Sequence, residues 1–227
     1  MTVKRHQDEV WPTAALWDAG IRLGHRLRLP PRPLLPAAPG MRLTGPLRPI
    51  RHTEGVVSIL EGLDSAHEGD VLLIDNDGRM DEACVGDLVA IEARLAGIAG
   101  LVVWGCHRDT DELAVIGLPV FSLGPCPASP TLRPVPGGQG PGAFEVRAGD
   151  VAGGDSDGLV IVPADVHKEV VDVAQAIVQA EQRQADRVLG GVSLREQLHW
   201  EQFRERRRAE PSYTFRDHLS QVSGALE

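Results

Sequence analysis

The stretch GDVLLIDNDGRMDEACVGDLVAIEARLAGIAGLVVWG, residues 69–105, decides the predicted fold. It contains two continuous apolar runs, GDVLLID at 69–75 and AGLVVWG at 99–105. Runs of this length and composition are typical of strands that are buried on both faces. A helix-length segment separates them, and this order predicts a parallel pair of strands joined by a right-handed crossover.

The segment between the two strands predicts a helix over residues 87–97. Leu88, Ile91 and Leu95 recur at helical spacing and therefore form one apolar stripe. Gly97 suits the end of this helix, because glycine readily adopts the left-handed conformation that ends many helices. The middle of the chain therefore reads as an α/β unit.

The N-terminal segment predicts a short helix and then an irregular path. PTAALWDAGIRLG (12–24) has a proline near its start and a glycine past its end, as helices often do. MRLTGPLRPI (41–50) has the composition of a strand, but Pro46 and Pro49 cannot donate ladder hydrogen bonds. We therefore expect this segment at a sheet edge or off the sheet.

The C-terminal half predicts two further strand regions and then helices. IGLPVFSLG (116–124) predicts a third short strand, and TLRPVPGGQGPGA (131–143) predicts a loop or a disordered connection. FEVRAGDVAGGDSDGLVIVP (144–163) predicts two strands joined by a GDSDG turn. A long helix should follow Pro163, and SLRE (193–196) has the spacing of a capping box that opens another helix.

The chain divides into one main domain and a tail. We expect an α/β domain over residues 1–198 and a helical C-terminal extension over residues 199–227. The cationic run RERRR at 204–208 is interpreted as a solvated helix face.

The composition excludes several classes of protein. Hydrophobic residues make up 42% and charged residues 24%, as in ordinary globular proteins, while the net charge of -9 argues against a general nucleic-acid binder. Three cysteines match neither a zinc motif nor a disulfide framework, which favours a reducing compartment. The N-terminus lacks the apolar core of a signal peptide, and no apolar run is long enough for a bilayer, so we expect a cytoplasmic protein without membrane contact.

Polar residues gather where the predicted parallel strands end. Ligands of open α/β sheets bind beyond the carboxyl ends of the strands, and neighbouring strands bring these ends together. Three clusters are expected to meet there: Asn76, Asp77 and Gly78; Gly86, Asp87 and Leu88; and His107, Arg108, Asp109, Asp111 and Glu112.

The residue types in these clusters suit a charged site for a small acid. Amides at the start of the helix near Asp87 and Leu88 can hold a carboxylate, and Arg108 can bind an oxyanion with two hydrogen bonds. Asp109 is a hard oxygen ligand suited to Mg²⁺ or Mn²⁺. Such an ion beside an arginine polarises the ketone of a 2-oxo acid, although a strand-end Arg-Asp pair is also a common structural salt bridge.

The order of these motifs resembles the class II 4-hydroxy-4-methyl-2-oxoglutarate aldolases and the related regulator-of-ribonuclease-activity-A-like proteins. Their aldolase signature is an aspartate, twenty residues, Arg-Asp, two residues and an acid; here Asp87, Arg108, Asp109 and Glu112 match it. The resemblance extends from about Thr13 to about Leu198. It implies a compact β/β/α sandwich of the swivelling-domain type with flanking helices.

The resemblance also implies a role for each matching residue. Asp109 matches the direct metal ligand and Arg108 the arginine that contacts the pyruvyl oxygen and steadies the enolate. Asp87 matches an acid that acts on the metal through water. Glu112 matches the acid at the last position of the signature. Gly86, Asp87 and Leu88 match the turn whose amides hold the substrate carboxylate. Glu181, in AEQRQADR, resembles a glutamate that reaches a neighbouring subunit's site, although an exposed helix glutamate is an equally good interpretation.

Three departures from the family pattern bear on the substrate. Asn76 and Asp77 stand where relatives have glycines, and His107 stands where a small apolar residue is common. His107 is therefore either a substrate contact or the partner of a neighbouring acid. The segment GPLRP at 45–49 replaces a GPART-like sequence.

These observations predict a Mg²⁺- or Mn²⁺-dependent carbon–carbon lyase. The substrate would be a small 2-oxo acid, cleaved by retro-aldol reaction or by oxaloacetate-type decarboxylation. The resemblance further implies a homotrimer or hexamer with sites at the subunit boundaries. Arg108, Asp87 and Glu181 would be the catalytic residues, and Asp109, Asp87 and Glu112 the metal-site residues. Two alternatives remain, a non-catalytic protein-binding regulator and an aldolase of a specialised pathway with a different acceptor.

Overall fold

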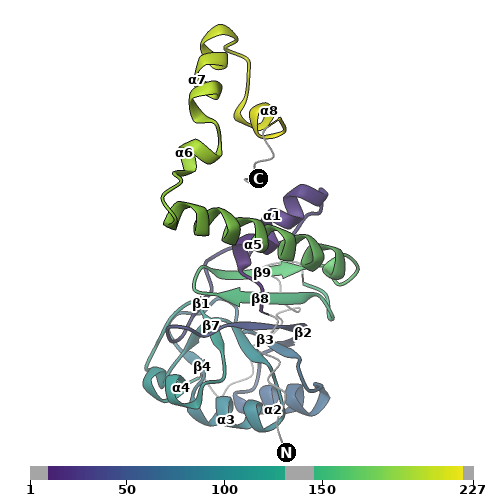
Figure 1. The fold of residues 1–227 in the computed structure, drawn as a ribbon. Coiled ribbons are helices and arrows are strands. Elements are labelled where there is room, and N and C mark those ends of the chain that lie inside the picture. Colours follow the sequence, from purple (N-terminus) through teal and green to yellow (C-terminus); the bar gives the residue numbers. More distant parts are fainter. Residues whose placement is uncertain (1–9, 131–145, 222–227) are drawn as a thin grey trace, which may run out of the picture.

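The computed structural model describes residues 10–130 and 146–221, so the loop expected over 131–143 lies outside the described residues. A seven-stranded sheet forms the body, with strand order β1-β7-β5-β3-β2-β8-β9 (Figure 1). Its strands are β1 (Leu35–Pro36), β2 (Leu43–Arg51), β3 (Val71–Asp75), β5 (Gly100–Trp104), β7 (Val120–Ser122), β8 (Val151–Asp155) and β9 (Gly158–Val162). Two short strands, β4 (Ala83–Val85) and β6 (Cys106–His107), pair separately.

The described residues contain eight helices. They are α1 (Thr13–Leu23), α2 (Val56–Ser65), α3 (Asp87–Leu95), α4 (Thr110–Ile116), α5 (His167–Leu189), α6 (Leu194–Gln197), α7 (Trp200–Ala209) and α8 (Phe215–Leu219). Figure 1 shows α2, α3 and α4 on one side of the sheet and α1 and α5 across β8 and β9 on the other. None of the helices in the described parts of the chain is long and apolar enough to cross a membrane.

The parallel strands at the centre confirm the β–α–β prediction. β3 pairs in parallel with β5, from Val71 opposite Gly100 to Asp75 opposite Trp104. Every residue of both strands is buried, as their continuous apolar sequences require. β7 then pairs in parallel with β5, and β8 and β9 form the expected antiparallel hairpin.

The prediction that residues 41–50 lie at an edge or off the sheet is wrong for the strand as a whole. β2 lies inside the sheet, but its two halves have different partners. Leu43–Pro46 pairs only with β8, and Leu47–Arg51 pairs only with β3. Each half of β2 is therefore hydrogen-bonded to a neighbouring strand on one side only. A proline, which has no N–H to donate, is tolerated in a segment that is paired on one side only.

The sheet curls until it is nearly closed. β1 lies close to β8 and β9, at the opposite end of the strand order. β9 separates two apolar cores, since Leu159 and Ile161 pack inside the curled sheet, whereas Val160 and Val162 pack against α1 and α5. The fold is thus the expected mixed α/β architecture, with a barrel-like sheet and flanking helices.

Helix α3 presents its large apolar side chains to solvent. The helix forms where the spacing predicts it, but its buried residues are the small Ala90 and Ala93. Leu88 is 75% exposed and Leu95 is 78% exposed. An amphipathic stripe normally faces the core, so the outward stripe of α3 needs another explanation.

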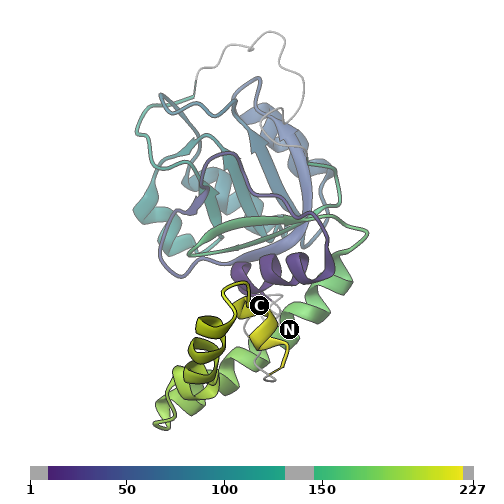
Figure 2. The ribbon, with the colours of Figure 1, turned by 90° about the horizontal axis from the view of Figure 1, so that it is seen from above.

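The C-terminal helices form an arm that projects from the body (Figures 1 and 2). Ser193 opens α6 with the predicted capping box, because its side chain accepts from the Glu196 amide while Glu196 bonds back to the Ser193 amide. The arm has its own small aromatic cluster, in which Phe203 contacts Trp200, Tyr213, Phe215 and His218. It therefore carries a core that is separate from those of the body.

Candidate active site

The short β4–β6 pair brings two of the polar clusters together. β4 and β6 run in parallel, and the Arg108 amide donates to the Val85 carbonyl oxygen at 2.9 Å. The residues that follow each strand therefore leave the sheet side by side, with Gly86 at the start of α3 and Asp109 at the start of α4. The sequence predicts this juxtaposition at the ends of the strands at 69–75 and 99–105, whereas the structure produces it at the ends of the short pair β4–β6, which was not predicted.

Asp109 holds an unusual backbone conformation at the centre of this site. Its φ is 57°, in the left-handed region that aspartate and asparagine adopt more readily than most residues. Its Oδ2 accepts from the Asp87 amide at 3.3 Å and lies 3.4 Å from Arg108 Nε. A Cβ at position 86 would overlap this Oδ2 atom. Glycine at 86 is therefore what lets the carboxylate lie against the start of α3.

The amides of the Gly86–Asp87–Leu88 turn already have partners in this structure. The Leu88 amide donates to Oδ1 of Asp87 at 2.7 Å, and the Asp87 amide donates to Asp109. Both acceptors are carboxylates, which matches the preference of a helix start for negative charge. A substrate carboxylate would have to replace one of them.

Arg108 lies beside a small open cavity. Its Nη1 donates to Ser129 Oγ at 2.9 Å, and its side chain is 39% exposed. A cavity of about 290 Å³ opens next to it, with Arg108, Asp109 and Thr110 on one wall and Pro125, Cys126 and Pro127 on the other. A small acid could therefore reach Arg108 and Asp109 from solvent.

Other expected site residues lie elsewhere. Glu112 lies in the first turn of α4 and lines an apolar groove together with Asp87 and Val115. Glu181 lies exposed on α5, which packs with α1 against β9 on the other side of the sheet from α3 and α4 (Figure 1). Within one chain, Glu181 therefore does not join Arg108 and Asp109.

Asn76 of the DNDG turn forms a buried hydrogen bond that the sequence did not reveal. Asn76 Oδ1 lies 3.0 Å from Nδ1 of His52, and both residues are buried. Burial lowers the pKa of His52, although the hydrogen bond with Asn76 opposes this shift. Asn76 therefore faces inward, while Asp77 adopts the left-handed conformation of the turn. No spacing in the sequence links positions 52 and 76, because only the pairing of β2 with β3 brings them together.

His107 bridges the two elements that flank the site. Its Nδ1 lies 2.6 Å from Ser122 Oγ on β7, and its Nε2 lies 3.0 Å from Thr110 Oγ1 at the start of α4. Burial lowers the pKa of His107, so the ring is neutral at pH 7. Ser122 Oγ also accepts from the Gly124 amide at 3.0 Å and donates to the Gly124 carbonyl oxygen at 3.4 Å, so both ring nitrogens of His107 face hydroxyl groups that the fold holds in place. In this structure His107 is thus a bridge between β7 and the start of α4, and its two hydrogen-bond partners are hydroxyl groups, not acids.

We expect Ser122→Ala to lower the free energy of unfolding by about 1–3 kcal/mol, because it leaves Nδ1 of His107 and the Gly124 amide without a buried partner. Thr110→Ala should cost less, because Thr110 is partly exposed and water can replace its hydroxyl. Urea unfolding of the two variants measures the difference. Equal stability of Ser122→Ala and wild type would show that the bridge contributes nothing.

The residues present fit a hydrated metal ion. Within residues 10–130 and 146–221, no group of three His, Cys, Asp or Glu side chains gathers that could enclose a metal. A magnesium site needs only one or two protein carboxylates, because waters complete its octahedron. Asp109 supplies a carboxylate that is 33% exposed and is already fixed by the Asp87 amide. Asp109 could therefore hold Mg²⁺ or Mn²⁺ with most ligands as water.

The fold is that of an α/β protein with a nearly closed sheet, and its candidate site, with Arg108 and Asp109, lies at the end of a short parallel strand pair. The chain belongs to the RraA-like family, described as Aldolase/RraA, whose sequence profile matches residues 13–161.

Individual relatives agree with this assignment. The chain is 35% identical over 128 residues to a protein of Alkalilimnicola ehrlichii named "Putative 4-hydroxy-4-methyl-2-oxoglutarate aldolase", covering 53% of this chain and 77% of that protein. The match to Uncharacterized protein MJ0644 of Methanocaldococcus jannaschii, at 29% identity, covers 55% of this chain and 62% of that protein, less than two thirds of its length.

Solved structures share the fold. An uncharacterized protein from Pseudomonas syringae pv. tomato superposes with a TM-score of 0.70 at 29% identity, covering 82% of this chain and 92% of that chain. RraAS2 of Streptomyces coelicolor, described as an unusual member of the RNase ES inhibitor RraA protein family, has a TM-score of 0.65 at 26% identity, covering 76% and 90%. The family thus includes proteins named for an aldolase and proteins named for ribonuclease inhibition.

Proposed function

We propose that this protein is a divalent-metal-dependent carbon–carbon lyase that releases pyruvate from a small 2-oxo acid. The observation that carries the proposal is the placement of Arg108 and Asp109 at the edge of a solvent-accessible cavity, with the Asp109 carboxylate held against the start of α3. The aldolase name of the Alkalilimnicola relative supports the same reaction class. Substrates of this class are 4-hydroxy-4-methyl-2-oxoglutarate and oxaloacetate.

The reaction needs stabilisation of negative charge on the 2-oxo oxygen as the carbon–carbon bond breaks. Arg108 is the cation of the site and would donate to that oxygen, since its guanidinium borders the cavity. Asp109 would hold Mg²⁺ or Mn²⁺, with Asp87 acting on the ion through water; when bound, the ion supplies Lewis-acid polarisation of the substrate carbonyl.

Residues at the edges of the site would orient the substrate and hold water. The amides of Asp87 and Leu88 would orient the substrate carboxylate once their present carboxylate partners turn away. Glu112, at the start of α4, would hold water near the ion. Glu181 would act on the site of a neighbouring copy, in a cytoplasmic homotrimer or hexamer.

A pyruvate-release assay over a panel of 2-oxo acids tests this proposal. We expect turnover with Mg²⁺ or Mn²⁺, loss of turnover in chelator, and recovery when the metal is restored. Turnover of any 2-oxo acid that persists at its full rate in chelator would contradict the metal-dependent mechanism. Absence of pyruvate release from every member of the panel would contradict the lyase itself.

A second candidate is a protein-binding regulator without catalysis. The internal pairing of the Leu88 and Asp87 amides favours it, because these donors are not free for a substrate carboxylate. Calorimetry with Mn²⁺ discriminates between the two functions, since the regulator has no need of an ion at Asp109.

A further inference from the structure

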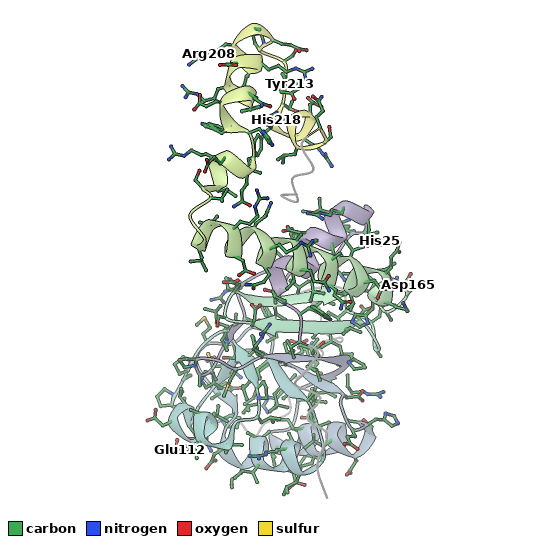
Figure 3. All side chains as sticks on the ribbon, in the orientation of Figure 1. His25, Glu112, Asp165, Arg208, Tyr213 and His218 are labelled. Carbon is green, nitrogen blue, oxygen red and sulfur yellow. The ribbon has the colours of Figure 1, made fainter. Side chains whose placement is uncertain are left out.

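A second cavity lies at the α1–α5 side of the sheet, away from Arg108. Its volume is about 1060 Å³, against about 290 Å³ for the cavity beside Arg108. Three segments form most of it: residues 25–29, which follow α1, residues 147–150, which precede β8, and residues 163–166, which precede α5. Figure 3 shows His25 and Asp165 of this cavity at one end of the α1–α5 layer, far from Glu112. We call it the α5-start cavity.

The three segments of the α5-start cavity are joined at one buried carboxylate. Asp150 is 4% exposed, and it forms an ion pair with Arg28. Its oxygens also accept from the amide of Arg147 at 2.9 Å and from the amide of Ala164 at 3.3 Å. Arg28 is fixed in turn, because its backbone exchanges two hydrogen bonds with Ile161 of β9. The fold therefore holds all three segments in place, as in most preformed ligand sites.

The α5-start cavity carries more positive than negative charge. Arg26, Arg28 and Arg147 line it, against Asp150 and Asp165. Arg26 and Arg147 are exposed, and neither side chain forms a hydrogen bond or an ion pair with the described residues. Nε of Arg28 is buried and also lacks a partner among them, so Arg28 has a donor that Asp150 does not use. The cavity therefore offers two free guanidiniums to an anion that enters it.

The start of α5 adds to the preference for negative charge. This helix has 23 residues, and no side chain caps its first amides. Ala164, Asp165 and Val166, directly before the helix, line the cavity. The first amides of a helix lack intrahelical partners and carry partial positive charge. The acid in the first turn, Glu169, is engaged by His25, whose Nε2 lies 2.9 Å from its Oε2.

Apolar side chains also line the α5-start cavity. They are Trp17, Leu27, Leu29 and Pro163. Trp17 packs against the core that α1, α5 and β9 share, so its ring is held by the body. A rigid aromatic side chain beside free cations suits a ligand that combines an apolar body with charged groups.

We propose that the α5-start cavity binds a small organic dianion, with its negative groups held by Arg26 and Arg147 and its apolar body against Trp17. The negative groups are carboxylates or phosphates, because both accept from guanidinium groups in the same bidentate geometry. The site is separate from that of Arg108 and Asp109. The proposal therefore goes beyond the proposed function and does not depend on it.

Calorimetric titration of the full-length protein tests the proposal, after a chelating resin has removed metal ions. The probes are benzene-1,3-dicarboxylate and phenyl phosphate. We expect saturable binding of at least one of them, and no binding of benzene-1,3-dicarboxamide, which has the shape of the first probe without its charge. The tighter probe shows which negative group the cavity prefers. Failure of both dianions to bind, or equal binding of the diamide, would overturn the proposal.

Four substitutions locate the bound dianion. Arg26→Gln and Arg147→Gln each remove a free guanidinium from an exposed position, so the fold should survive and the affinity should fall about tenfold. Arg22→Gln removes an exposed arginine of α1 that lies outside the cavity, so it is the matched control and should keep the wild-type affinity. Asp165→Asn should tighten binding about two- to threefold, because it removes a like charge from the wall.

Arg108→Gln separates this site from the candidate active site. It should abolish pyruvate release and leave the affinity for the dianion unchanged. Unchanged affinity in either Arg26→Gln or Arg147→Gln, a comparable loss in Arg22→Gln, or loss of binding in Arg108→Gln would each overturn the proposal. Wild-type protein that binds the dianion but releases no pyruvate would count only against the proposed function.

Discussion

Asp109→Asn is expected to lower kcat/KM for pyruvate release by about 10³-fold, because several kcal/mol of charge stabilisation depend on an ion that this carboxylate would hold. Asparagine tolerates the left-handed backbone at this position, so the turn should survive. The substitution therefore separates the loss of charge from a loss of fold.

Mn²⁺ binding gives a second readout for this variant that does not depend on turnover. The electron paramagnetic resonance signal of free Mn²⁺ should show weaker binding to Asp109→Asn than to wild type. Asp157→Asn, in the exposed β8–β9 turn, is the matched control and should bind Mn²⁺ normally. Wild-type Mn²⁺ affinity in Asp109→Asn would remove Asp109 from the metal site.

Gly86→Ala is expected to lower kcat/KM by about 100-fold while leaving the fold intact, because misplacing a reacting group by about 1 Å can cost this much. The φ of Gly86 is -143°, which alanine adopts without strain. The added methyl group would overlap Oδ2 of Asp109, so that carboxylate would have to turn away. The side chain can move at little cost in stability, but the site would lose its geometry.

Gly100→Ala is the matched control, because it should lower stability and leave kcat/KM nearly unchanged. A Cβ at position 100 would lie 3.0 Å from both the Leu43 side chain and the Pro119 carbonyl oxygen, inside the core and away from Arg108. It should lower the melting temperature more than Gly86→Ala and change kcat/KM less. If Gly86→Ala keeps full activity, the packing of Asp109 against the start of α3 has no role in the reaction.

The central strands could be predicted from the sequence because burial on both faces leaves a continuous apolar pattern. β3 and β5 carry that pattern without interruption, and the helix between them follows its spacing. β2 could not be placed correctly, because its prolines argue against a central strand unless the ladder changes sides between Pro46 and Leu47. Such a change of partner leaves no signal in one sequence.

The candidate site was partly predictable for a similar reason. The ends of neighbouring parallel strands meet, so the sequence predicts that Asp87 approaches Arg108 and Asp109, but the pair that brings them together, β4 with β6, is too short to leave a strand pattern that could be predicted. The pairing of His52 with Asn76 depends on tertiary contact alone, and so does the use of His107 as a bridge to Ser122. The outward stripe of α3 carries the same spacing as a core-facing stripe, so periodicity cannot show which side it faces.

The left-handed backbone of Asp109 also bears on how this scaffold can evolve. A single base change converts an aspartate codon into an asparagine codon, and asparagine is one of the few residues besides glycine that adopt this conformation readily. If Asp109 has the role proposed for it, a lineage would lose catalysis in one mutational step while it keeps the same shape and the same surfaces for selection to use. Under that proposal, an enzyme and an inert descendant that only binds other proteins are genetic neighbours on this scaffold.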